Sequence, residues 1–263
     1  MKNRQPYNLD RVMIVYNIIQ IICCTYLFYE GVIFWTAKYK LFCEPIDYSE
    51  TKEALHTLKL IYFYYILKIL DLADTVFFVL RKKFNQVSFL HVYHHTGMVM
   101  MVWGAGTYLP GGHGSSVGLI NSFVHVIMYS YYLLTVAAPS MKNSVTLKKF
   151  VTQIQILQFL LLVLHVGSIV FIPDCAYPRW VTAIFLPQNL FMLILFVDFY
   201  IKNYIKKPKQ SAQVKKIEEE CSEIKHNLKK NGSATHFVES KHDYHSELIL
   251  RNNKTSEIFN KSR

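Results

Sequence analysis

The sequence has few charged residues for its length. Only 18% of its 263 residues are charged, whereas 52% are hydrophobic and 15% are aromatic, and the mean hydropathy is +0.18. This composition excludes an ordinary soluble domain, because too little polar surface is available to cover it. We therefore expect a polytopic membrane protein.

A basic surface of the kind that binds nucleic acid is also missing, although the formal net charge is +11. Of the 29 Lys and Arg residues, 14 lie from Lys202 onward, where 8 of the 18 acidic residues are mixed with them. Most of the others flank apolar segments, as basic residues of cytoplasmic loops do. We expect no nucleic-acid partner. A secretory signal peptide is not evident either, because the first apolar run is too long for one and has no small-residue cleavage site.

Apolar segments of membrane-spanning length occur six times. A helix needs about 20 residues to cross the hydrocarbon core, and the segments are 12–36, 58–80, 88–109, 115–138, 149–172 and 180–201. Basic residues precede the first segment and follow the second, fourth and sixth, so both termini are expected to face the cytosol. The sequence thus predicts an all-α membrane protein, a bundle or barrel of about six transmembrane helices.

The chain is expected to divide into two parts. Residues 1–205 contain all six apolar segments and would form the transmembrane catalytic domain. Residues 206–263 are rich in Lys, Glu, Asn and Ser and have few apolar residues, so they cannot bury enough surface to fold alone. We expect them to form a disordered, basic, cytosolic tail.

Cysteine is scarce, with five residues in the chain. Cys43 and Cys175 fall in the first and third non-cytosolic loops of the predicted topology, where an oxidising lumen permits a disulfide. We predict that these two residues pair, although sequence alone does not fix connectivity.

Polar side chains recur at helical spacing inside four of the spans. In the third span, His91, His94 and His95 stand at i, i+3 and i+4 and share one face. The other stripes are Lys68, Asp71, Asp74 and Thr75 in the second span, Asn121, His125, Tyr129 and Tyr132 in the fourth, and Thr152, Gln155, Gln158 and His165 in the fifth. Polar groups at membrane depth are costly and usually functional. We expect the stripes to line a common substrate tunnel, the alternatives being a structural ion pair and amides that only join helices.

Histidine-rich membrane helices are typical of two kinds of chemistry. A di-iron desaturase or hydroxylase needs about eight histidine ligands, and the predicted spans hold five histidines. Metal-free acyl transfer needs an imidazole nucleophile or base, a group that orients it, and donors that stabilise an oxyanion. His94, His125, Asn121, Gln155 and Gln158 supply these parts. A small-molecule transporter whose polar stripes line a path is a third hypothesis.

The motifs together resemble those of the animal fatty acid elongases of the ELO type, over about residues 3–207. They are YNIIQ at 16–20, KxxxxxDT at 68–75, HVYHH at 91–95, NSFVHVIMYSYY at 121–132 and TxxQxxQF at 152–159. The resemblance implies a very-long-chain 3-oxoacyl-CoA synthase. Such an enzyme condenses a long-chain acyl-CoA with malonyl-CoA, releases CO2 and CoA, and gives a 3-oxoacyl-CoA two carbons longer, as the first step of the microsomal elongation cycle.

The resemblance also implies roles for particular residues. The expected catalytic residues are His91, His94, His95 and His125, with an acyl-imidazole formed on His94. The expected substrate-binding residues are Lys68, Asp71, Asp74, Asn121, Tyr129, Gln155 and Gln158. No metal or cofactor is implied beyond the two CoA substrates. Basic residues near 81–83 and 148–149 would attract the CoA phosphates.

Further expectations concern place and partners. The resemblance implies a multi-pass protein of the endoplasmic reticulum membrane that supplies very-long-chain acyl groups for lipids such as sphingolipids. It would work beside a ketoacyl reductase, a dehydratase and an enoyl reductase, and would associate as a homo-oligomer. Two departures are visible: Asp71 stands where the family has Glu, and the resemblance begins near the family's second span, so we expect its first helix to be missing here.

Overall fold

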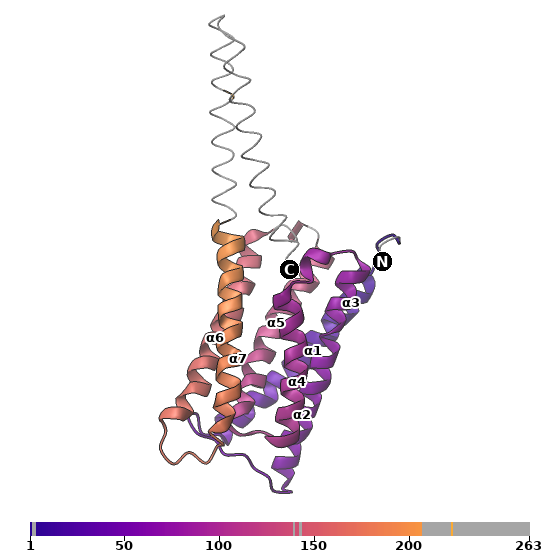
Figure 1. Ribbon diagram of the computed structural model, residues 1–263. Helices are drawn as coiled ribbons and strands as arrows, with labels where there is room; N and C mark the ends of the chain where they lie inside the picture. The colour runs from indigo at the N-terminus through magenta and orange to yellow at the C-terminus, as the bar shows by residue number, and fades with distance from the viewer. Residues whose placement is uncertain (2–3, 139, 142–143, 207–221, 223–263) are drawn as a thin grey trace, which may run out of the picture. The chain divides into compact units, whose positions relative to one another are not determined.

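The computed structural model describes residues 1, 4–138, 140–141, 144–206 and 222 (Figure 1). Its helices are α1 (Asp10–Ala37), α2 (Lys52–Leu70), α3 (Ala73–Leu80), α4 (Phe89–Tyr108), α5 (Ser116–Ala137), α6 (Val145–Ser168) and α7 (Trp180–Tyr200). Short turns of 3-10 helix are η1 (Phe84–Gln86), η2 (Gly112–Ser115) and η4 (Ile169–Phe171). The described residues contain no strand, which confirms the all-α class.

The chain divides into two units, 1–200 and 201–263. The second begins with the π-helical turn η5 (Ile201–Lys206). The predicted tail, 206–263, lies outside the described residues apart from Lys206 and Ser222, so its disorder and the boundary at 205 stay predictions.

Within the described residues, four helices are long and apolar enough to cross a membrane, and they contain α1, α5, α6 and α7. This confirms a membrane protein. The other two predicted spans correspond to less apolar helices, because α2 carries Lys52, Glu53, Lys59 and Lys68 and α4 carries the three histidines. The expected total of six spans and the enclosed tunnel therefore stay predictions.

Three of the helices begin at a hydroxyl side chain that caps the first turn. The side-chain oxygens of Thr51, Ser88 and Ser144 accept hydrogen bonds from the backbone N–H groups three residues later, at 3.2 to 3.4 Å. Such caps satisfy donors that have no partner within the helix. The cap at Ser88 fixes where α4 starts and hence which turn carries His91.

The second predicted span is divided in two. One helix was expected over 58–80, but α2 ends at Leu70 and α3 begins at Ala73. At this joint the N–H of Leu72 bonds to the carbonyl of Ile69 at 3.1 Å, and the N–H of Asp74 bonds to that of Asp71 at 3.2 Å. Bonds three residues apart tighten a helix end. Asp71 therefore lies at a tight turn between two helices, where its side chain accepts hydrogen bonds from Gln20 and Tyr129.

The helices of the first unit pack mainly in pairs. α1 lies along α5, α6 along α7, and α2 beside α4 (Figure 1). One core cluster joins Cys24 and Leu27 of α1 to Leu67 of α2 and Val102 of α4. Apolar residues also point outward, and Ile22 remains 63% exposed. Exposed apolar side chains on a spanning helix are suited to contact with lipid.

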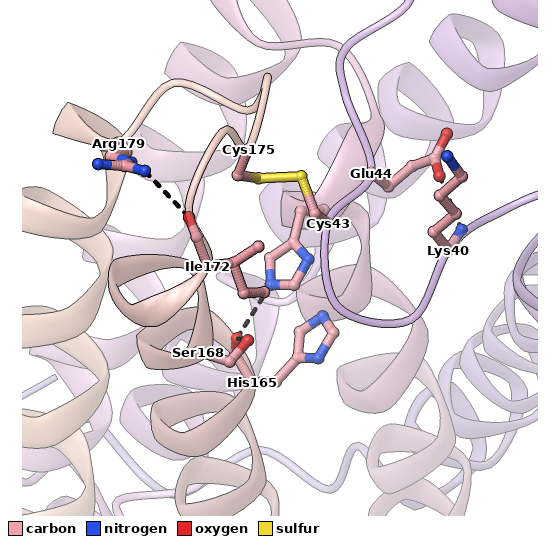
Figure 2. Close-up of a disulfide and its surroundings, with 9 residues drawn as sticks. Lys40, Cys43, Glu44, His165, Ser168, Ile172, Cys175 and Arg179 are labelled. Carbon is pink, nitrogen blue, oxygen red and sulfur yellow. Dashed lines mark hydrogen bonds between the residues drawn. A yellow bond between two sulfur atoms is a disulfide. The ribbon is translucent and has the colours of Figure 1, made fainter.

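A disulfide joins Cys43, between α1 and α2, to Cys175, between η4 and α7 (Figure 2). The predicted pair is thus present, with an S–S distance of 2.04 Å. In the loop of Cys175, Arg179 donates to the carbonyl of Ile172 at 2.9 Å. Two connections far apart in sequence are therefore held together at this end of the helices.

A close backbone approach reinforces the same region. The N–H of His113 donates to the carbonyl of Glu44 at 2.9 Å. Gly112 has a positive φ of 61°, and a Cβ there would lie 2.9 Å from the carbonyl oxygens of Glu44 and Pro45. Only glycine meets both conditions without displacing the backbone.

Removing the disulfide should destabilise the protein measurably. Cys43→Ser is expected to cost about 2–5 kcal/mol, because the bond closes a long loop that is otherwise free in the unfolded chain. Thermal unfolding of the purified protein in detergent would measure the loss. Cys23→Ser is the control, since Cys23 is a free cysteine, and an equal loss in both variants would contradict the expectation.

Candidate active site

Lys68, Asp71, Asn121 and His125 meet in the interior. The ammonium group of Lys68, 3% exposed, donates to Asp71 Oδ2 at 2.7 Å and to Asn121 Oδ1 at 3.0 Å. It lies 3.4 Å from His125 Nδ1, and this nitrogen is 3.6 Å from Asp71 Oδ2. A buried charge must be paired and hydrogen-bonded, and this ammonium is both.

The contact with Lys68 favours one tautomer of His125. An ammonium group has only donors, so a hydrogen bond across these 3.4 Å makes Nδ1 of His125 the acceptor. The hydrogen of the neutral ring then lies on Nε2, from which His125 can donate to a group bound beside it.

Two tyrosines extend this group of residues. The hydroxyl of Tyr64 donates to Asn121 Oδ1 at 2.7 Å. The hydroxyl of Tyr129, which is completely buried, bridges Asp71 Oδ1 at 2.9 Å and Asp74 Oδ2 at 3.2 Å. We call these residues the lysine network: Lys68, Asp71, Asp74, Asn121, His125, Tyr64 and Tyr129. Tyr64 was not predicted, although it stands one turn before Lys68 on the same helix face.

α1 also reaches the lysine network. Gln20 Nε2 donates to Asp71 Oδ1 at 3.0 Å, and the hydroxyl of Tyr16 donates to the carbonyl of Leu70 at 3.2 Å. Both residues belong to the motif YNIIQ, for which we predicted no role. The available signal was a pair of amides, Asn17 and Gln20, within an apolar span.

The histidine box comprises His91, His94 and His95 of α4. His91 Nε2 lies 3.0 Å from the hydroxyl oxygen of Thr75 in α3, and the rings of His91 and His95 are 4.3 Å apart. His95 is buried, at 8% exposure. This side of the box faces α3 and is held there by Thr75.

His94 points in a different direction from the other two. Its ring stands edge to face against Phe159 of α6 at 5.9 Å and Phe196 of α7 at 6.4 Å, and 5.4 Å from the ring of His95. It is only partly buried. Phe159 and Phe196 thus pack against the His94 imidazole, and its remaining exposed surface is available to a bound reactant.

One short segment contacts both groups of residues. Asp71 and Asp74 belong to the lysine network, and Thr75 contacts His91 of the histidine box. The joint between α2 and α3 therefore sets where the two groups lie relative to each other.

The polar residues of α6 lie in three different surroundings. Gln158 Oε1 accepts from Asn121 Nδ2 at 3.5 Å, so Gln158 borders the lysine network. Gln155 instead contacts the sulfur of Met128 at 3.5 Å. His165 stacks on His113, with ring centroids 3.9 Å apart, near the disulfide. His113 was not predicted, because it precedes the apolar segment of α5.

An apolar cavity of about 120 Å³ lies beside the lysine network. Its walls come from α1, α2, α4 and α5, and include Leu27, Tyr64, Val102 and Ser122. Tyr177, in the loop before α7, also lines it. Burial raises the pKa of Tyr177 to about 12, so its hydroxyl is neutral at physiological pH.

No metal was expected here, and this stays a prediction. Within the described part of the chain, no group of three or more His, Cys, Asp or Glu side chains is arranged to hold a metal ion.

The histidine box of α4 and the buried pair of Lys68 and Asp71 thus form a polar site beside an apolar cavity, within a helical membrane protein. Residues 1–212 match the ELO family, described as the GNS1/SUR4 family. The chain belongs to this family.

The chain is similar to several very long chain fatty acid elongases. It is 40% identical over 217 residues to elongase 7 of Drosophila melanogaster, covering 82% of this chain and 66% of that protein. It is 40% identical over 210 residues to an elongase of Aedes aegypti, covering 78% and 57%. Elongase 1 of Mus musculus is 40% identical over 209 residues, with 78% and 75% covered. The chain thus spans less than two thirds of the two insect relatives.

Proposed function

We propose that this protein condenses a long-chain acyl-CoA with malonyl-CoA. The observation that carries the proposal is the position of Tyr64. Its ring lines the apolar cavity, while its hydroxyl donates to Asn121 of the lysine network. A cavity for an acyl chain would thus adjoin polar groups for a thioester, and the elongase names of the relatives agree with such a substrate.

His94 is proposed as the nucleophile of the first half-reaction. Its imidazole attacks the thioester carbonyl of the acyl-CoA, a bond to the acyl carbon forms, and the bond from that carbon to sulfur breaks. CoA leaves as a thiolate and takes up one proton. Covalent catalysis of this kind divides a difficult step into two easier ones.

The lysine network is proposed to serve the second half-reaction. Malonyl-CoA loses CO2, and the electron pair of the broken bond forms an enolate. Its carbon attacks the acyl group on His94, which releases the imidazole and gives the 3-oxoacyl-CoA. His125 Nε2–H would donate to the enolate oxygen, and the nearby positive charge of Lys68 would stabilise the negative charge that develops there, because preorganised donors and charges in a dry site are effective at this. Over both steps, one proton is consumed and one CO2 and one CoA are released.

The remaining expectations are part of the same proposal. Asp71, Asp74, Asn121, Tyr129 and Gln158 would hold and orient the substrates, and Gln155 would act at the edge of the site. The reaction would need no cofactor. The protein would lie in the endoplasmic reticulum membrane, beside the two reductases and the dehydratase that complete the cycle, as a homo-oligomer.

Incorporation of radiolabelled malonyl-CoA by membranes that contain the protein tests this proposal. We expect a 3-oxoacyl product two carbons longer than the primer, formed equally with and without a metal chelator. Loss of product with chelator would favour a metal-dependent reaction such as that of a di-iron enzyme. Absence of product from correctly inserted protein would refute the condensation.

Filling the cavity should reduce the use of long primers. Gly118 lines the cavity, and a Cβ there would lie 3.9 Å from the ring of Tyr64. Gly118→Val is expected to cost about 1–3 kcal/mol for any chain that needs this space, roughly a 5- to 150-fold loss in kcat/KM. Shorter primers should be less affected.

The matched control is Gly104→Val in α4, where a Cβ meets no atom within 4 Å. Rates with a series of primers of increasing length would compare the two variants. An equal loss for every primer with Gly118→Val would argue against an acyl chain in this cavity.

A further inference from the structure

Gln20 of α1 is buried, at 1% exposure, and directs its amide toward the joint between α2 and α3. Its Nε2 donates to Asp71 Oδ1 at 3.0 Å and to the hydroxyl of Tyr16 at 3.1 Å. Tyr16 in turn donates to the carbonyl of Leu70. One turn of α1 therefore holds both the backbone and the side chain of this joint.

The two oxygens of Asp71 have different partners. Oδ2 accepts from Lys68 at 2.7 Å and lies 3.6 Å from His125 Nδ1. Oδ1 accepts from Gln20 and from Tyr129, at 3.0 and 2.9 Å. Because Gln20 and Tyr129 hold Oδ1, they resist rotation of the carboxylate. Oδ2 therefore stays directed at Lys68.

This support comes from outside the helices that carry the site. Asp71 lies at the joint between α2 and α3, and Gln20 approaches its side chain from α1. Tyr129 is shared with Asp74 and divides its hydrogen bond between two carboxylates. Gln20 has no second carboxylate among its recorded partners, which makes it the more selective support for Asp71.

The amide of Gln20 is kept at an energetic cost. Its Oε1 is buried and has no hydrogen-bond partner. Turning the amide over would place this oxygen against the Asp71 carboxylate, so the observed orientation is required. A buried acceptor without a donor is destabilising. An apolar side chain of similar length would remove this cost, but it would also take away one donor from the buried Asp71 carboxylate.

We propose that Gln20 is a positioning residue that orients Asp71 and, through it, Lys68 and His125 for the reaction. This inference rests on the proposed condensation. Gln20→Met should reduce kcat roughly 10- to 100-fold, since a small misplacement of reacting groups has effects of that size. The KM for acyl-CoA should change less than about twofold, because the acyl cavity is untouched.

A length exchange tests the same contact. Gln20→Asn keeps the amide but shortens it by one methylene, and Asp71→Glu lengthens the acid by one methylene. The double variant Gln20→Asn, Asp71→Glu should recover at least about tenfold in kcat over Gln20→Asn, because the two sites are coupled by direct contact. A double variant no faster than Gln20→Asn would overturn the proposal, as would wild-type kcat in Gln20→Met.

Gln153→Met in α6 is the matched control. It removes an exposed amide that donates to Tyr200 at 3.1 Å, outside the site, and should leave kcat unchanged. Nitrogen-15 NMR of the full-length protein with labelled histidine provides a readout without turnover. Gln20→Met should shift the His125 nitrogen resonances and Gln153→Met should not. An inactive wild type would refute the condensation, whereas unshifted His125 resonances would refute the positioning role.

Discussion

Replacing His94 with alanine should abolish condensation while leaving the protein folded. The partly buried ring of His94 contacts Phe159 and Phe196 and takes part in no recorded ion pair, so its loss removes only ring contacts. If the acyl group is carried on this imidazole, the rate should fall by roughly 10³-fold or more, as for other covalent nucleophiles. Product formation from radiolabelled malonyl-CoA would measure the loss.

The acyl intermediate offers a second measurement. Wild-type protein incubated with acyl-CoA alone should gain the mass of one acyl group, and His94→Ala should not. His56→Ala is the matched control, because this histidine pairs with Glu30 and lies outside both the lysine network and the histidine box. Full activity of His94→Ala, or an acyl group that forms without His94, would rule out this nucleophile.

Much of the fold follows from the length and polarity of segments in the sequence. The ends of α1, α4, α5 and α7 lie within two residues of the predicted 12–36, 88–109, 115–138 and 180–201. Hydropathy detects such helices because each must pair its backbone groups internally in lipid. The break at Asp71 could not be predicted in this way, because hydropathy does not distinguish one continuous helix from two helices that meet at a tight turn.

The candidate site shows a similar division. Helical spacing predicted that Lys68, Asn121 and His125 would face one interior, and they are in contact. Helical spacing did not predict that Gln155 would contact Met128. Residues on one broad face of a helix can contact different neighbouring side chains, as Gln155 and Gln158 do. His165 was placed with Gln158 by the same spacing, yet it stacks on His113 of another element. Which side chains meet across two helices depends on how the helices are rotated relative to each other. The sequence of a single helix does not specify this rotation.

The second large effect is expected at Lys68. Lys68→Met removes the cation that pairs with Asp71 and leaves a carboxylate that is 1% exposed without its charge partner. Breaking a buried pair on one side typically costs about 3–5 kcal/mol. We expect a strong loss of thermal stability, measured by unfolding in detergent, together with loss of condensation.

A second substitution separates these two losses. Asp71→Asn in the Lys68→Met background removes the unpaired charge, and its amide oxygen can still accept from Gln20 and Tyr129. Stability should return to near the wild-type value, because removing both charges of a buried pair is often neutral. Condensation should remain absent, since the ammonium that would stabilise the enolate is still missing. An active double variant would show that Lys68 serves the fold alone, and a double variant as unstable as Lys68→Met would show that the cost does not come from the unpaired carboxylate.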